Sequence, residues 1–188
     1  MTTPADSIRT YIRAKDENRP FLMRQAFAED AELEMVVKTE SISFPKSAKG
    51  RAAIEDILVR RFAIDFENVY TFCLSQPSAE TRLHFPCNWL VGMSGKSDGQ
   101  IRVGCGRYDW HFTTDALSLA RKLIITIDHM QILSGAELDA SMTWLARLPY
   151  PWCTADVAAR SIPAIDALAP IKRYLEAARP ITPDNGST

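Results

Sequence analysis

The hydrophobic pattern of this chain changes its period near residue 68, and this change limits the folds that the chain can adopt. Before it, apolar residues recur every three to four positions, as on one face of a helix; after it they alternate, as in half-buried strands. The alternating runs cover 67–75, 82–94, 101–113 and 121–133. Long strands this close in sequence favour an antiparallel meander. Helices followed by a curved sheet predict the α+β class.

Helical segments are predicted on both sides of this sheet region in the sequence. One begins at Pro4, a short one follows Pro20, and a third begins at Gly50, with an alternating strand over 31–37 between the last two. The helical period returns after Ser134. We therefore predict one domain over residues 1–133 and a C-terminal helical extension over 134–188. The extension is expected to pack on the same domain and to fray from about residue 181.

Composition excludes several classes of protein. The 188 residues are 46% hydrophobic and 24% charged, with a net charge of −1, so a basic nucleic-acid-binding face is not expected. No apolar run approaches the ~20 residues needed to cross a bilayer, so we predict no membrane partner. The four cysteines have no CxxC spacing and are predicted to be buried free thiols. This cysteine usage and the lack of a signal-peptide pattern predict a cytoplasmic protein.

Metal and cofactor motifs are also missing from the sequence. There is no HxH or HExxH spacing among the three histidines. The glycines around Cys105 lie inside a strand pattern and are not followed by a helix, so they do not form a dinucleotide loop. We therefore predict no cofactor and no metal.

A row of polar residues on two neighbouring strands is the most informative local feature. A turn centred near Ser97 pairs His84 with His111 and Asn88 with Arg107. Because side chains alternate along a strand, these four and Asp109 project from one face of the sheet. The opposite face carries an aromatic row: Phe85, Trp89, Tyr108, Trp110 and Phe112. Periodicity alone leaves open whether the polar row faces solvent or an enclosed pocket.

Three local features, in this order and spacing, resemble the NTF2-like superfamily. They are the link Phe27-Ala28-Glu29-Asp30-Ala31, the helix start Gly50-Arg51-Ala52-Ala53-Ile54, and the long curved sheet that follows. The resemblance covers residues 1–133 and is similar to the SnoaL-like and ketosteroid-isomerase-like branches, with scytalone dehydratases and limonene epoxide hydrolases as relatives. It implies a cystatin-like conical roll that encloses a pocket between the helices and the concave sheet face.

The resemblance also implies roles for individual residues. Asp109 matches the pocket aspartic acid that donates to an oxyanion in ketosteroid isomerases, and Tyr11 matches the tyrosine that supplies the second hydrogen bond. Arg107-Tyr108-Asp109 is similar to the Arg-x-Asp of the epoxide hydrolases. The aromatic row would then bury against a second subunit in a homodimer that forms through the sheet face.

One departure from the family pattern affects the chemistry. Met35 stands where the isomerases have their general base, and a methionine takes no proton. A histidine pair resembling that of the scytalone dehydratases, His84 and His111, would replace it as the base. Asp128 on the last strand would pair with Arg107 or orient a histidine.

Three functions remain open from the sequence. The first is a cofactor-independent isomerase, dehydratase or cyclase-like lyase that acts on a hydrophobic carbonyl compound. The second is a module that binds a small hydrophobic molecule without chemistry. The third is a structural or interaction role that uses the aromatic sheet face for assembly. The residues expected to line the pocket in the first two cases are Leu33, Met35, Phe62, Asn88 and Met93.

Overall fold

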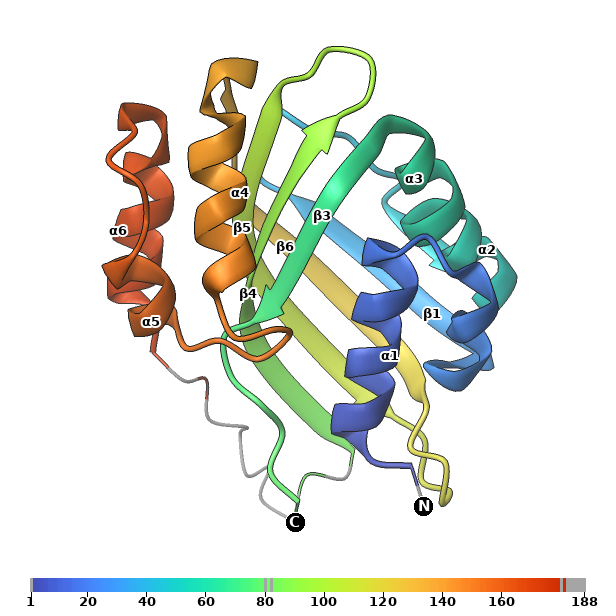
Figure 1. Cartoon of the computed structure of the whole chain (residues 1–188). Helices are drawn as coiled ribbons and strands as arrows, with labels where there is room; N and C mark the ends of the chain where they lie inside the picture. The colour runs from blue at the N-terminus through green and yellow to red at the C-terminus, as the bar shows by residue number, and fades with distance from the viewer. Residues whose placement is uncertain (1, 80, 82, 180, 182–188) are drawn as a thin grey trace.

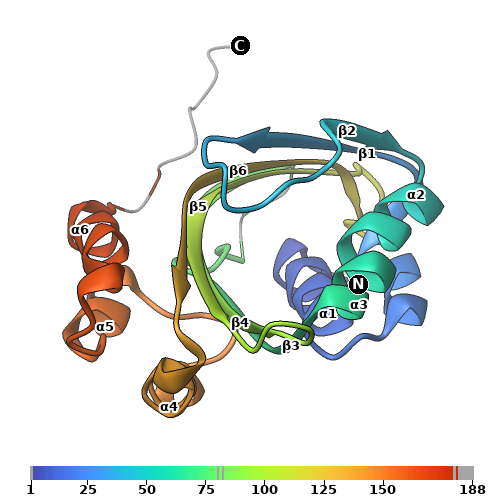
Figure 2. The same ribbon diagram turned by 90° about the horizontal axis from the view of Figure 1, so that it is seen from above.

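In the computed structural model, a curved sheet wraps around the N-terminal helices, and three further helices lie on its outer face (Figures 1 and 2). The structure describes residues 2–79, 81, 83–179 and 181. The strands are β1 (Phe27–Val37), β2 (Ser47–Lys49), β3 (Phe66–Cys73), β4 (His84–Gly95), β5 (Ile101–Phe112) and β6 (Ala120–Leu133). The helices are α1 (Pro4–Asp16), α2 (Arg51–Glu55), α3 (Phe62–Asp65), α4 (Leu138–Arg147), α5 (Ala155–Arg160) and α6 (Ala169–Ala177). Short 3₁₀ helices occur at Pro20–Gln25, Gly135–Glu137 and Asp166–Leu168, and a π-helical segment, Asp56–Arg61, joins α2 to α3.

The six strands lie in the order β2-β1-β6-β5-β4-β3, and only the β1–β6 pair is parallel among the pairs that the structure describes. The predicted α+β class with a mainly antiparallel curved sheet is therefore confirmed. The predicted register is also confirmed, because His84 lies opposite His111 and Asn88 lies opposite Arg107. The sequence pattern missed β2, which has only three residues and pairs with β1.

Local signals in the sequence explain where the N-terminal helices begin. Thr3 and Asp6 form a reciprocal capping box at the start of α1, and Pro4 occupies its first turn. Gly50 precedes α2 with a φ of 88°, a backbone conformation that residues with a side chain rarely adopt.

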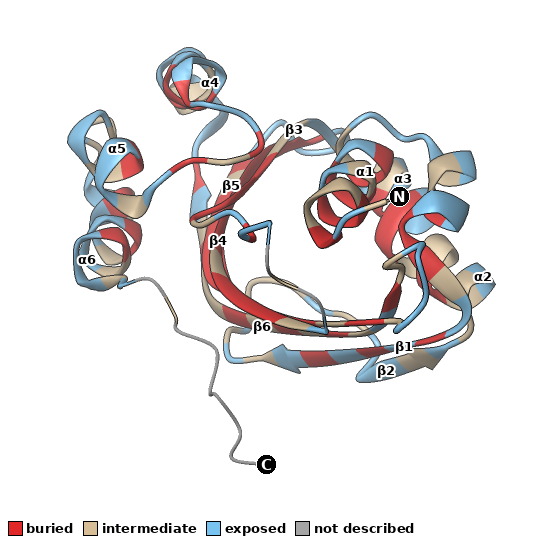
Figure 3. Cartoon of the chain, turned by 90° about the horizontal axis from the view of Figure 1, so that it is seen from below, coloured by how far each residue is buried: buried red, intermediate tan, exposed pale blue. Residues whose placement is uncertain are grey.

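The main hydrophobic core lies between α1, the α2–α3 segment and the concave face of the sheet (Figure 3). The aromatic row of β4 and β5 points into this core. Trp110 and Phe112 are fully buried there, and Tyr108 is 3% exposed. The prediction that this row would bury against a second subunit is therefore wrong, because the chain's own N-terminal helices cover it.

The outer face of the same strands is divided into two halves. On β5 the outward series begins with Ile101, Val103 and Cys105, which are buried beneath the C-terminal helices in a second core. The series continues with Arg107 and Asp109, where the helices no longer cover the sheet and the side chains are polar and partly exposed. One row of alternating positions thus changes from apolar to polar where the helical cover ends.

The C-terminal segment supplies that cover. Leu145 of α4 packs so closely over β4 that a Cβ on Gly92 would collide with its side chain. The Tyr174 hydroxyl of α6 donates to the Gly106 carbonyl of β5 at 2.7 Å. The fraying predicted from about residue 181 falls almost entirely outside the described residues.

Two further predictions concern the cysteines and the membrane. Cys73, Cys87, Cys105 and Cys153 are all free and buried, as predicted. Among the described residues, no helix has both the length and the hydrophobicity needed to span a membrane.

Candidate functional site

A small cavity lies between α1, the α2–α3 segment and the concave face of the sheet. Its volume is about 50 Å³, enough for a few water molecules. Its walls are almost wholly apolar. The lining residues are Tyr11, Lys15, Met35, Ile42, Phe44, Leu58, Phe62, Trp89, Val91, Met93, Tyr108, Ile125, Ile127 and Met130.

Two tyrosine hydroxyls are placed in this wall by α1 and β5. Tyr11 and Tyr108 are both buried, and their rings meet edge to face with centroids 6.3 Å apart. Burial raises the pKa of Tyr11, and it raises the pKa of Tyr108 well above its usual value. The neighbouring Tyr108 hydroxyl partly offsets the rise in the pKa of Tyr11. Both groups are therefore neutral hydrogen-bond donors at physiological pH.

Lys15 lies one helical turn after Tyr11 and brings a positive charge to the same cavity. Its side chain is only 7% exposed, and its Nζ lies 4.4 Å from the centre of the Phe62 ring. The partner of this ammonium is the Asp16 carboxylate, at 3.1 Å.

Asp16 is in turn held by three other donors. The Thr71 hydroxyl and backbone N–H each donate to it at 2.7 Å, and the Tyr150 hydroxyl donates at 3.0 Å. This network fixes the end of α1 against β3 and against the segment that leads to α5. The Lys15 ammonium can form further hydrogen bonds, because it has three N–H groups.

The loop over residues 38–46, between β1 and β2, contributes two residues to the wall of the cavity. Ile42 and Phe44 from this loop line the cavity, and together with Phe62 they also line a second hollow of about 400 Å³ on the other side. These three side chains therefore separate the small cavity from a larger space that opens toward Arg61 and Arg102.

Four of the predicted site residues lie in the cavity wall. Tyr11, Met35, Phe62 and Met93 all line it, on four different elements of the fold. Leu33 is buried in the same core but is not among the lining residues.

The predicted ionisable row lies on the outer face of the sheet, so the pocket assignment of Asp109, His84, His111 and Arg107 is corrected. His84 Nε2 lies 2.5 Å from Asp109 Oδ1, and His111 Nε2 lies 3.4 Å from the same oxygen. Arg107 approaches the other oxygen of Asp109, at 3.7 Å. Burial lowers the pKa of His111, and the Asp109 carboxylate acts in the opposite direction. The sheet itself separates this cluster from the cavity.

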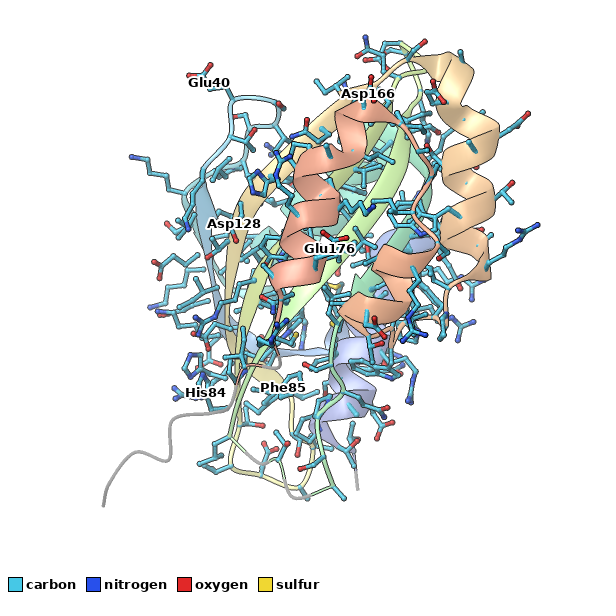
Figure 4. All side chains as sticks on the ribbon, turned by 90° about the vertical axis from the view of Figure 1, so that its left-hand side faces the viewer. Glu40, His84, Phe85, Asp128, Asp166 and Glu176 are labelled. Carbon is cyan, nitrogen blue, oxygen red and sulfur yellow. The ribbon has the colours of Figure 1, made fainter. Side chains whose placement is uncertain are left out.

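Asn88 and Asp128 are also corrected. Asn88 lies on the outer face, where it accepts a hydrogen bond from the Tyr174 hydroxyl at 2.9 Å and so anchors α6. Asp128 pairs with Lys38 at 2.8 Å, not with Arg107 or a histidine. It lies at a β-bulge of β6, where the pairing with β5 shifts by one residue (Figure 4 labels Asp128 and His84). Neither residue lines the cavity.

Sequence reasoning missed Lys15, Tyr108 and two residues of the loop between β1 and β2, Ile42 and Phe44. Lys15 follows Tyr11 by four positions, and this spacing puts two residues on one face of a helix. The sequence analysis placed Tyr108 in an aromatic row outside the pocket, whereas this row faces the N-terminal helices and the cavity. No periodic signal marks Ile42 or Phe44, since they lie in an irregular loop.

The cavity can bind and polarise an acceptor group. The lining residues that carry polar groups are Tyr11, Tyr108, Lys15 and Trp89, and the indole N–H of Trp89 has no hydrogen-bond partner among the described residues. Among the described residues that line the cavity, none is a histidine, a carboxylate or a cysteine.

Comparisons with known proteins agree with this architecture. By sequence, the chain matches no family model and no curated protein. By structure, it is similar to an NTF2-like superfamily protein from Salmonella enterica, at 13% identity and a TM-score of 0.52 over 66% of this chain and 88% of that one. A hexachlorocyclohexane dehydrochlorinase, LinA type 2, gives 13% identity and a TM-score of 0.55 over 69% and 86%.

A computationally designed 17-OHP binder also resembles the chain, at 13% identity and a TM-score of 0.52. The match covers 70% of this chain and 99% of that one. At these identities the similarity establishes architecture and not activity. The chain therefore has the NTF2-like fold.

Proposed function

We propose that this protein binds a small hydrophobic molecule that carries a hydrogen-bond acceptor, and that it does so without chemistry. The molecule would occupy the cavity, with its apolar body against Met35, Met93 and Ile125. Its acceptor would be a carboxylate or a carbonyl held by Lys15 and Tyr11.

The observation that carries this proposal is the composition of the cavity wall. Every polar side chain in it can donate a hydrogen bond, and the imidazoles and carboxylates expected to move a proton lie outside it. Met35 occupies the position where the resemblance places a base. Donors without a proton acceptor hold a ligand in place but do not abstract a proton from it.

The small volume of the cavity and the loop that borders it are also part of the proposal. A cavity of about 50 Å³ is smaller than the ~300–1,000 Å³ of common small-molecule sites. Outward rotation of Ile42 and Phe44 would join it to the neighbouring hollow of about 400 Å³. The joined space falls within that range, and a loop without strand or helix can move at low cost. The similarity to a designed binder is consistent with such a use of the fold.

The test is binding of a defined probe, decanoate, measured by calorimetry and by displacement of the fluorescent anion 8-anilinonaphthalene-1-sulfonate. Ile125→Phe fills the cavity from β6, and we expect it to weaken decanoate binding about tenfold or more, or about 1.4 kcal/mol. Ile124→Phe is the matched control, because Ile124 is the neighbouring residue on the opposite face of the same strand.

Thermal unfolding of both variants checks that the larger side chain has not disrupted the core. Met35→Phe provides a second blocking variant on a different strand. Equal binding by the blocked variants and the control would contradict the proposal, as would failure of the wild-type protein to bind any member of an alkanoate, ketone and steroid series.

The second candidate is the cofactor-independent isomerase or lyase that acts on a hydrophobic carbonyl compound. The adjacent neutral hydroxyls of Tyr11 and Tyr108 favour it, because such donors stabilise a developing oxyanion. The Lys15 amine would then have to move the proton. Turnover of a β,γ-unsaturated ketone that is lost in Lys15→Met would favour the enzyme over the binding module.

Two further predictions from the sequence remain predictions. A homodimer would have to use the part of the outer sheet face that α4–α6 leave open, and sedimentation equilibrium tests it. Cytoplasmic localisation rests on the reduced cysteines, and fractionation of the native host tests it.

A further inference from the structure

The outer face of the sheet carries a compact cluster of two imidazoles and one carboxylate, at the end of β4 and β5 that the C-terminal helices leave open. Figure 4 looks onto this face and labels His84 at the end of β4. His84 lies directly opposite His111, and Asp109 precedes His111 by two residues on the same strand. One ligand atom from each of the three residues lies within 4.8 Å of the other two.

The sheet holds this cluster in place. The backbone pairing of β4 with β5 fixes the distance between the two histidines, whose rings stack at 4.7 Å with an interplanar angle of 28°. Both Nε2 atoms are directed at the same carboxylate oxygen, Asp109 Oδ1. Arg107 contacts the other oxygen, Oδ2, and so orients the carboxylate. Such outer partners fix the orientation of a metal ligand.

We propose that His84, Asp109 and His111 form a binding site for a divalent transition-metal ion of the zinc class. Two imidazole nitrogens and one carboxylate oxygen are three ligands that zinc accepts, and a water molecule would complete a tetrahedral set. The three side chains are 34%, 24% and 30% exposed, so the site has an open side for both the ion and that water.

Two of the three distances between ligand atoms can be compared with those that an ion requires, and all three lie within 4.8 Å. Bonds of about 2.0–2.1 Å in a tetrahedron place neighbouring ligand atoms about 3.3 Å apart. The His111–Asp109 separation of 3.4 Å already matches, whereas the His84–Asp109 separation of 2.5 Å is that of a hydrogen bond. The ion would replace that hydrogen bond, and a small rotation of the carboxylate opens the required space.

The surrounding charges limit the affinity but do not block the site. Lys122 lies opposite His111 on β6, but its ammonium is directed to Glu34, at 3.3 Å. Arg107 remains on Oδ2, which leaves Oδ1 as the ligand oxygen. With one anionic ligand and three cations nearby, Arg107, Arg121 and Lys122, we expect binding in the micromolar range.

The experiment is calorimetric titration of Zn²⁺ into tag-free protein, together with the visible absorption of bound Co²⁺. The chain has one further histidine, His129, which packs against Tyr174 and lies outside the cluster. His129→Ala is therefore a matched control for His84→Ala and His111→Ala. The four cysteines are buried and do not compete for the ion.

We expect one Zn²⁺ per chain, with affinity reduced tenfold or more in His84→Ala, His111→Ala and Asp109→Asn and unchanged in His129→Ala. Zn²⁺ should also raise the melting temperature of the wild-type protein and of His129→Ala only, which separates lost binding from lost folding. Absence of saturable binding in the micromolar range would overturn the proposal, and so would equal affinity in the cluster variants and the control. Decanoate binding in the cavity does not depend on this outcome.

Discussion

Replacement of Lys15 by methionine is the substitution that most directly tests how the cavity recognises a ligand. The methionine keeps most of the apolar stem and removes the charge, including the Nζ atom that lies over the Phe62 ring. The Asp16 carboxylate loses one of four partners, because the two hydrogen bonds from Thr71 and the one from Tyr150 remain.

The expected cost in stability follows from this count of partners. Removal of one member of a buried ion pair destabilises a protein by about 3–5 kcal/mol when the remaining charge is left unpaired. Here three donors still satisfy Asp16, so we expect a loss of about 1–2 kcal/mol in the free energy of unfolding.

The expected cost in binding depends on the charge of the probe. A hydrogen bond to a charged group contributes about 1.5–3 kcal/mol, so decanoate should bind about 10–150-fold more weakly to Lys15→Met. Decan-1-ol, which has no charge, should lose much less. Lys49→Met is the control, since Lys49 is 80% exposed on β2.

Calorimetric titration of both probes at one ionic strength measures the difference, and urea denaturation measures the stability. If decanoate and decan-1-ol lose affinity equally, the ammonium of Lys15 does not recognise the acceptor. An unchanged decanoate affinity would lead to the same conclusion.

Three further predictions concern the loop between β1 and β2, the C-terminal helices and the buried hydroxyls. Phe44→Ala should speed association of decanoate in stopped-flow fluorescence, whereas Phe21→Ala, at an exposed position, should leave the rate unchanged. Tyr174→Phe removes the hydroxyl whose single proton is shared between the Asn88 and Gly106 oxygens, and it should reduce the free energy of unfolding by about 1–2 kcal/mol in urea. The raised pKa of both cavity tyrosines means that the unfolded chain loses those protons first, so stability should fall as the pH rises above about 10. Absorbance titration should then show fewer ionised tyrosines in the folded than in the unfolded protein, and equal numbers would contradict the burial of these hydroxyls.

The sequence analysis predicted the register of β4 and β5 correctly, but it assigned the wrong face of these strands to the pocket. Register follows from the turn and from alternation, which are local, and the pairing of His84 with His111 is as expected. Which face of the sheet points inward depends on which face the N-terminal helices cover. A polar row on one face and an aromatic row on the other are compatible with a polar pocket and with an apolar core. The sequence analysis assumed a catalytic pocket and therefore placed the polar row inside. The outward row of β5 contained the decisive signal, because its first half is apolar and only its second half is polar.

That half-apolar row also indicates the place of the C-terminal extension. Ile101, Val103 and Cys105 need a partner layer on the outer face, and residues 134–179 provide it. A chain that ended at residue 133 would leave this surface in water, where a contiguous apolar patch is rarely stable. The apolar outward residues of β5 therefore predict where the C-terminal extension packs, but only once the inner face of the sheet is known. The sequence does not predict that Ile42 and Phe44 line the cavity, because an irregular loop has no hydrophobic period.

The segment Arg107-Tyr108-Asp109 shows how the fold divides chemistry that the sequence places together. Tyr108 points into the cavity as a neutral donor, and its two neighbours point outward, where Asp109 joins the two histidines. A strand cannot direct consecutive side chains to one face, so no movement short of a register shift brings Asp109 into the cavity. A register shift would also bury Arg107 among aromatic rings without a partner, at a cost of several kcal/mol. The inner site and the outer cluster are therefore separate, and a cavity variant combined with a cluster variant should change ligand and metal affinities independently.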